Sequence, residues 1–154
     1  MKAIVWTKYG PPDVLQLEEV EKPLPGDADV LIRICATNVF PGDCEMRRFD
    51  VHPSLWLPIR LYMGIRKPRV KILGQELAGE IESVGSAVTQ FKKGDKVLAC
   101  TGMKFGSYAE YACLPDHYVL ALKPNNVNYE EAATIPVGGR HALHFLRKGN
   151  LESG

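Results

Sequence analysis

The sequence predicts a mainly β domain with short helices. Residues 29–37 alternate, with Val30, Ile32, Ile34 and Ala36 on one face, which is the period of a half-buried strand. Short apolar runs separated by Gly, Pro and Asp recur from residue 2 to residue 123, a spacing typical of a small barrel or sandwich. The 154 residues suffice for one core and are too few for two full-sized domains.

The strands are expected between clear turn signals. Glycines bracket the central one at Gly74, Gly79 and Gly85, where they usually mark bends or close backbone approaches. Alternation and breakers together predict strands over residues 2–6, 15–20, 29–37, 73–85, 96–101, 107–114 and 118–123.

Three helices are expected. Residues 41–49 can open as a helix, because Pro41 suits a first turn and Asp43 is favoured near the positive helix end. Asn128 is typical of a helix N-cap. The run from Pro136 to Gly139 is expected to interrupt that helix, and another helix is predicted over residues 140–148.

Composition narrows the class of partner. The 19 basic and 18 acidic residues leave a net charge of +1, so no global field favours nucleic acid or a membrane surface, and a small molecule is expected instead. No apolar run approaches the ~20 residues of a membrane span, and residues 1–6 are too short for a signal-peptide core. We therefore expect a cytoplasmic protein. The four cysteines lack a C-x-x-C pair, which argues against a disulfide framework and a structural zinc knot.

One stretch carries a family resemblance. Residues 73–85 read LGQELAGEIESVG and resemble the GHExxGxVxxVG signature of medium-chain dehydrogenase/reductases, which include zinc alcohol dehydrogenases and zinc-free quinone oxidoreductases. Residues 91–97 (FKKGDKV), 106–111 (GSYAEY) and 132–139 resemble further family motifs in the family's order. The resemblance implies a GroES-like catalytic domain, a distorted β-barrel, over residues 1–125. It implies that residues 126–154 are a helical connector toward a nucleotide-binding domain.

That second domain, of the Rossmann type, is expected to be missing from this chain. No strand is followed by G-x-G-x-x-G, and Gly138-Gly139 is followed by Arg140 and His141. The sequence therefore indicates a piece of a longer reductase. A stand-alone GroES-like module is the alternative.

The positions of the family's zinc ligands are altered. Gln75 stands where the zinc enzymes have a histidine, and Phe40 stands in the place of their first cysteine, three residues before Asp43. A catalytic zinc needs three protein ligands, an amide is a poor one, and Glu76 alone cannot hold the ion. We expect no metal site.

Candidate site residues follow from the zinc-free relatives. The stretch 37–43 resembles their Asn-Pro-x-Asp segment, with Phe40 in place of the asparagine. The resemblance places Phe40, Pro41 and Gly42 beside the cofactor, and Phe40 beside the substrate as well. Asp43 and Gln75 are the candidate catalytic residues. Asp43 could instead cap the local backbone, and Gln75 could be a satisfied structural amide.

Two further positions are candidates. Gly139 and His141 fall on the family's Gly-x-Thr, whose threonine reaches the nicotinamide, so both are candidate cofactor contacts; a surface histidine is the alternative. Tyr62 is a candidate substrate contact from its position only. It lies in a basic segment without acids whose cations are Arg60, Arg66, Lys67, Arg69 and Lys71. This segment is expected to cover the mouth of the active site, or to touch anionic lipid, RNA or a phosphate.

Together these residues predict hydride chemistry. A quinone or conjugated enone accepts hydride without a metal because the developing charge is delocalised, so the protein need only position donor and acceptor and hydrogen-bond the oxygen. The resemblance implies a zinc-independent, NADPH-dependent reductase of quinones or α,β-unsaturated carbonyls, homodimeric at full length and inactive as this chain alone. The alternatives are a non-catalytic GroES-like binding module that uses residues 60–71, and a zinc alcohol dehydrogenase with rearranged ligands.

Overall fold

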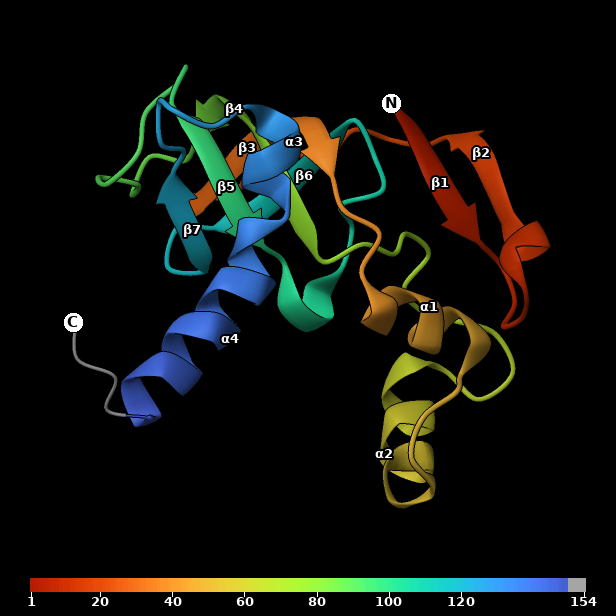
Figure 1. The fold of residues 1–154 in the computed structure, drawn as a ribbon. Helices are drawn as coiled ribbons and strands as arrows, with labels where there is room; N and C mark the ends of the chain where they lie inside the picture. The colour runs from red at the N-terminus through yellow and green to blue at the C-terminus, as the bar shows by residue number, and fades with distance from the viewer. Residues whose placement is uncertain (150–154) are drawn as a thin grey trace.

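The computed structural model describes residues 1–149 and contains a curled antiparallel sheet beside a separate hairpin (Figure 1). The hairpin pairs β1 (Lys2–Trp6) with β2 (Leu15–Glu19). The main sheet has the order β6-β3-β4-β5-β7. Its strands are β3 (Asp29–Thr37), β4 (Glu76–Val84), β5 (Lys96–Cys100), β6 (Tyr111–Pro115) and β7 (Val119–Leu122). This arrangement, with its short helices, confirms the predicted GroES-like fold class.

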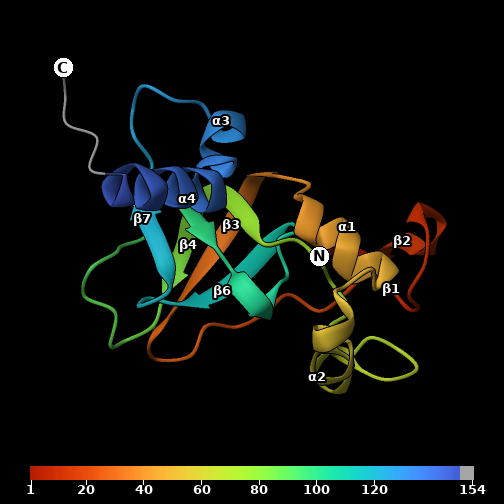
Figure 2. The same cartoon turned by 60° about the horizontal axis from the view of Figure 1, so that its bottom comes forward.

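Within residues 1–149 the fold also has four α-helices, α1 (Pro41–Arg48), α2 (Pro53–Met63), α3 (Tyr129–Ala133) and α4 (Ile135–Lys148), and two short 3-10 helices. Helices α3 and α4 lie on one side of the main sheet, whereas α1 and α2 lie beside the hairpin (Figure 2). Helix α3 is held to the sheet because Ala132 and Ala133 are buried against Ala78 and Leu98. No helix among residues 1–149 is long and apolar enough to cross a bilayer.

Besides the small cluster under α3, two larger apolar clusters lie within residues 1–149. The alternation of β3 buries Val30 and Ile32 completely, and they pack with Leu77 and Val97 of the neighbouring strands. A second cluster lies under the hairpin and α1, around Trp6, Phe49, Met63, Leu73 and Phe105. The buried apolar area of each cluster supplies the main driving force for its formation.

Several strand ends differ from the prediction because of glycine. The expected strand over residues 73–85 begins at Glu76, since Gly74 has φ +93°. The strand expected from residue 107 begins at Tyr111, after Gly106 with φ +102°. Both values lie in the left-handed region, which ends an extended run. Gly79 lies within β4, where a Cβ would meet the Arg33 carbonyl oxygen at 2.2 Å, so its role is a close backbone approach.

The expected helix break at Pro136–Gly139 is wrong. These residues form the first turns of α4, which begins at Ile135 directly after the cap residue Thr134. Proline is tolerated there because the first N–H groups of a helix have no intrahelical partner. Helix α2 likewise begins at Pro53, before the predicted basic segment, and contains Pro58. The last five residues of the predicted connector lie outside the described residues.

Candidate functional site

Glu76, the first residue of β4, joins three segments of the chain. Its side chain is 1% exposed. One carboxylate oxygen accepts a hydrogen bond from the Asn38 amide and the other accepts one from the backbone N–H of Val137, both at 2.8 Å. Thr37 donates to the Glu76 carbonyl oxygen at 2.7 Å. The carboxylate therefore fixes the loop after β3 and the positive end of α4 on the same strand end.

Asp43 lies on α1 and is 2% exposed. Its carboxylate accepts hydrogen bonds from the Tyr108 hydroxyl at 2.9 Å and from the Phe40 backbone N–H at 3.3 Å. Burial raises the pKa of Asp43 above its usual value, although the hydrogen bonds from Tyr108 and Phe40 oppose that shift. Burial and the neighbouring Asp43 also raise the pKa of Tyr108. Asp43 thus fixes the 40–43 turn.

Gln75 is half-buried and directly precedes Glu76, the first residue of β4. Its backbone oxygen accepts a hydrogen bond from the Thr101 N–H at 2.8 Å. Within residues 1–149 its side-chain amide makes no hydrogen bond, so the amide is available to a ligand. The preceding Gly74 is required by its positive φ and because a Cβ would meet the Ser107 hydroxyl at 2.2 Å.

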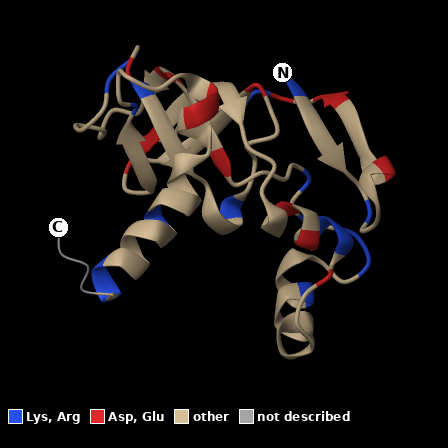
Figure 3. Ribbon diagram, viewed as in Figure 1, with Lys and Arg blue, Asp and Glu red and all other residues tan. Residues whose placement is uncertain are grey.

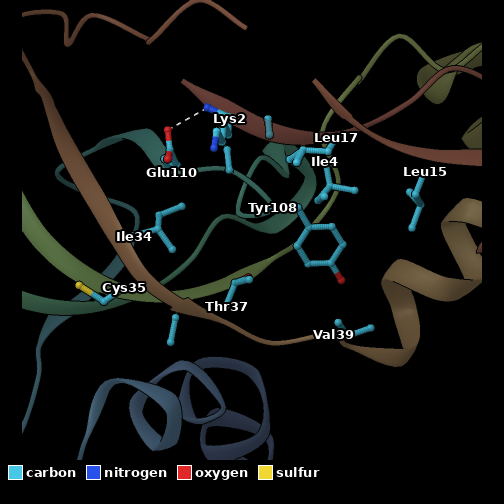
Figure 4. A pocket seen from close by; sticks show the side chains of 13 residues that line it. Lys2, Ile4, Leu15, Leu17, Ile34, Cys35, Thr37, Val39, Tyr108 and Glu110 are labelled. Carbon is cyan, nitrogen blue, oxygen red and sulfur yellow. Dashed lines mark hydrogen bonds between the residues drawn. The ribbon is translucent and has the colours of Figure 1, made fainter. Parts of the chain in front are cut away.

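An apolar groove lies between the hairpin and the second half of β3 (Figure 4). Its volume is about 710 Å³, and its apolar lining includes Ile4, Leu17 and Ile34. None of the predicted site residues lines it. Tyr108 connects the two regions, because its ring lines the groove and its hydroxyl donates to Asp43.

A second groove, of about 500 Å³, lies between α2, the turn at residues 101–104 and the first half of α4. Tyr62, Thr101 and Arg140 line it. The Tyr62 ring is exposed, and its hydroxyl donates to the Met103 carbonyl oxygen at 3.3 Å. Since Thr101 is bonded to Gln75, this groove adjoins one of the predicted catalytic residues.

The predicted cofactor contacts are divided between two places. Phe40 is half-buried at the start of α1, with its ring packed over Gly42, where a Cβ would meet it at 2.7 Å. Gly139 and His141 are exposed on α4. His141 shares a shallow pocket with Arg140, His144 and Phe145 of its own helix. The structure brings Asp43, Phe40 and Gln75 to one region around Glu76 and leaves His141 on the adjacent helix.

Comparison with known proteins identifies the family. The family model described as the alcohol dehydrogenase GroES-like domain matches residues 26–124, more than half of the chain. The chain belongs to the alcohol dehydrogenase GroES-like family. The match begins shortly before β3 and ends after β7, so it contains the whole five-stranded sheet.

Relatives in this family are oxidoreductases. A quinone oxidoreductase from Lama guanicoe is 37% identical over 139 residues, covering 89% of this chain and 38% of the relative. The 2-methylene-furan-3-one reductase of Solanum lycopersicum is 35% identical over 162 residues, covering 100% of this chain and 39% of the relative. The chain spans about two-fifths of the length of these curated relatives.

A solved structure agrees with the sequence comparisons. The Escherichia coli quinone oxidoreductase in complex with NADPH superposes with a TM-score of 0.79 at 26% identity, covering 97% of this chain and 41% of that one. The predicted membership of the medium-chain dehydrogenase/reductase superfamily, on the quinone oxidoreductase side, is confirmed.

The donor set of this GroES-like chain does not fit a catalytic zinc. Among residues 1–149 no three His, Cys, Asp or Glu side chains gather closely enough to hold a metal ion. The carboxylate of Glu76 is already bonded to Asn38 and Val137, while Gln75 offers only a neutral amide. We therefore derive no chemical step through a metal.

Sequence reasoning missed two residues of this GroES-like site. The sequence indicates Glu76 only as a possible metal ligand, whereas in the structure its buried carboxylate accepts hydrogen bonds from Asn38 and Val137, as a buried charge requires. Tyr108 lies within the GSYAEY motif and was given no role. The position of Tyr108 two residues after Gly106 in this motif was the signal that could have indicated a site residue.

Proposed function

We propose that this chain supplies the substrate-binding part of an NADPH-dependent reductase that reduces quinones or α,β-unsaturated carbonyls without zinc. The observation that carries the proposal is the half-buried Gln75, whose side-chain amide has no hydrogen-bond partner within residues 1–149 and whose backbone oxygen is bonded to Thr101, a residue that lines a groove of about 500 Å³. An amide N–H there can stabilise negative charge on a substrate oxygen, the task that a metal performs in zinc enzymes.

The cofactor is accommodated at the first turns of α4. A Cβ built on Gly138 meets nothing within 4 Å, so a flat ring can approach the helix there. Residues 40–42 together with Gly139 and His141 would hold the nicotinamide end, and the remainder of the cofactor would lie on a nucleotide-binding domain outside this chain. When bound, NADPH supplies the hydride.

The chain's own residues position the acceptor. Gln75 donates its amide N–H to the acceptor oxygen, and Tyr62 closes one side of the groove. Asp43 acts as a positioning residue, because its hydrogen bonds with Phe40 and Tyr108 hold the turn that carries Phe40. The aromatic face of Phe40 packs against a planar substrate.

Several wider features belong to the same proposal. Residues 1–125 form the catalytic domain and residues 126–154 the connector. The full-length protein is a cytoplasmic homodimer, and the 154-residue chain alone is inactive. The activities for which the relatives are named, reduction of quinones and of a methylene-furanone, support the substrate class.

The test is NADPH oxidation by the full-length protein with a panel of quinones and enones, with metal content measured on the same sample. We expect turnover without stoichiometric zinc. Gln75→Leu should lower kcat/KM by about a hundredfold to a thousandfold, the usual effect of losing one hydrogen bond to a developing oxyanion. Gln90→Leu, at an exposed position outside the site, is the matched control. Absence of turnover with every acceptor, or activity that requires zinc, would contradict the proposal.

A further inference from the structure

Helix α2 exposes apolar side chains on much of its surface. It projects away from the sheet together with its flanking loops (Figure 1). Leu57 and Leu61, one turn apart, are 60% and 52% exposed. The other exposed apolar residues are Leu55, Trp56 and Tyr62 of the helix and Ile65 of the loop after it. Exposed apolar patches of this kind, rather than single residues, mark interaction sites.

Of the exposed apolar residues of α2, Trp56 packs edge-on against Phe49, whereas Leu57 and Leu61 belong to none of the apolar clusters. The helix is fastened from its inner side, where the Arg60 guanidinium lies 4.0 Å from the Tyr9 ring centroid and 4.1 Å from that of Phe49. Met63 is fully buried, and the Tyr9 hydroxyl donates to the Gly64 carbonyl oxygen at 2.7 Å. Arg60 is therefore occupied by aromatic rings, and only the later cations of the basic segment face solvent.

A rim of positive charge surrounds the base of α2. The loop after α2 turns back sharply, since the Arg69 N–H donates to the Met63 carbonyl oxygen. Basic residues on this loop and at the end of α1 lie near one another (Figure 3). The exposed cations of the rim are Lys8, Arg48, Arg66, Lys67, Arg69 and Lys71. The exposed acids Glu45 and Asp50 lie at its margin, so positive charge predominates.

We propose that α2 and this rim form a docking surface for a membrane that contains anionic lipid. The apolar tip, led by Leu57 and Leu61, enters the boundary between head groups and acyl chains, and the rim contacts the anionic head groups. The exposed residues are largely aliphatic, so RNA bases would find few rings to stack on. A second copy of this chain would present the same positive rim and be repelled.

The test is co-sedimentation of the full-length protein with vesicles of phosphatidylcholine, with and without phosphatidylserine. We expect binding that requires phosphatidylserine and weakens as salt is raised. Arg66→Gln and Lys67→Gln should each weaken binding roughly fivefold, the effect of removing one basic residue from an anionic surface. The double variant L57S/L61S should weaken it about tenfold or more, because the apolar contribution is lost.

The matched control is L143S/L146S, which removes two similarly exposed leucines of α4 and should leave vesicle binding unchanged. Three results would overturn the docking surface: no binding of the full-length protein, equal binding to pure phosphatidylcholine, or equal loss in the α4 control. Retention of a uridine-rich RNA instead of vesicles, abolished by R66Q, would assign the rim to nucleic acid. None of these outcomes depends on reductase activity.

Discussion

Replacing Glu76 with glutamine tests whether its carboxylate joins the loop after β3 to α4. The side chain keeps its size, but an amide has one acceptor oxygen where the carboxylate has two. Whichever way it is oriented, its NH2 group faces either the Val137 N–H or the Asn38 amide, each of which now donates at 2.8 Å. With the new amide oxygen kept on the Val137 N–H, the Asn38 side chain can turn its own oxygen toward the NH2 group, so both charge-assisted hydrogen bonds become neutral ones.

The expected loss is about 2–4 kcal/mol in the free energy of unfolding. A hydrogen bond to a charged group contributes about 1.5–3 kcal/mol, and the negative charge at the start of α4 adds about 0.5–1 kcal/mol. A neutral amide costs less free energy to bury than a carboxylate, so the loss in the free energy of unfolding stays below the contribution of two charge-assisted hydrogen bonds. Such a loss is a large fraction of the ~5–15 kcal/mol typical of a domain.

Urea unfolding of the wild type and E76Q, followed by far-UV circular dichroism, measures this difference. The midpoint should fall while the slope with urea stays constant. Glu80→Gln is the matched control, because Glu80 lies on the same strand and forms only an exposed ion pair with Arg33 at 3.2 Å, which contributes up to about 1 kcal/mol. Equal midpoints for E76Q and E80Q would refute the reasoning.

Three further changes have expected outcomes. The pKa of Asp43 is raised above 3.8, so the folded state holds this proton more tightly than the unfolded state. As the pH falls from neutrality toward 3.8, the stability of the wild type in urea melts should therefore improve relative to that of D43N. A stability difference that does not change with pH would contradict this prediction. Gly79→Ala should cost about 1–3 kcal/mol, because its Cβ would meet the Arg33 carbonyl oxygen at 2.2 Å; thermal unfolding checks this. Gly138→Ala, in open space within α4, should instead raise stability by about 0.5–1 kcal/mol.

The sequence predicted best where local pattern and burial agree. The strand over residues 29–37 has the predicted bounds, because its alternation is typical of a strand, although Leu31 on the opposite face is buried as well. Helix α1 also begins at the predicted residue, Pro41, since proline and Asp43 both favour a helix start there. For the candidate site, the family motifs indicated the 40–43 turn and Gln75, which the structure brings to one region.

Features that depend on distant partners could not be predicted. Glu76 accepts hydrogen bonds from Asn38 and Val137, which lie 38 and 61 positions away in the sequence. No local pattern indicates partners at such distances. Arg60 reads as a solvated cation in the sequence, yet it stacks on Tyr9 and Phe49. The predicted start of α4 is wrong because Pro136 is typical of a helix break and of a first helical turn alike. The hydrogen bond from the Val137 N–H to Glu76 favours the first turn, and it joins residues far apart in the sequence.

The position of β3 within the sheet has a consequence for the order of folding. Its residues Asp29–Arg33 pair with Tyr111–Pro115 of β6, and its other edge pairs with β4. During synthesis β3 therefore leaves the ribosome long before either neighbour exists. Closing such long loops is slow, and unpaired strand edges invite aggregation meanwhile. We expect the chain to refold more slowly than a helical bundle of its size and to depend on chaperones at high expression.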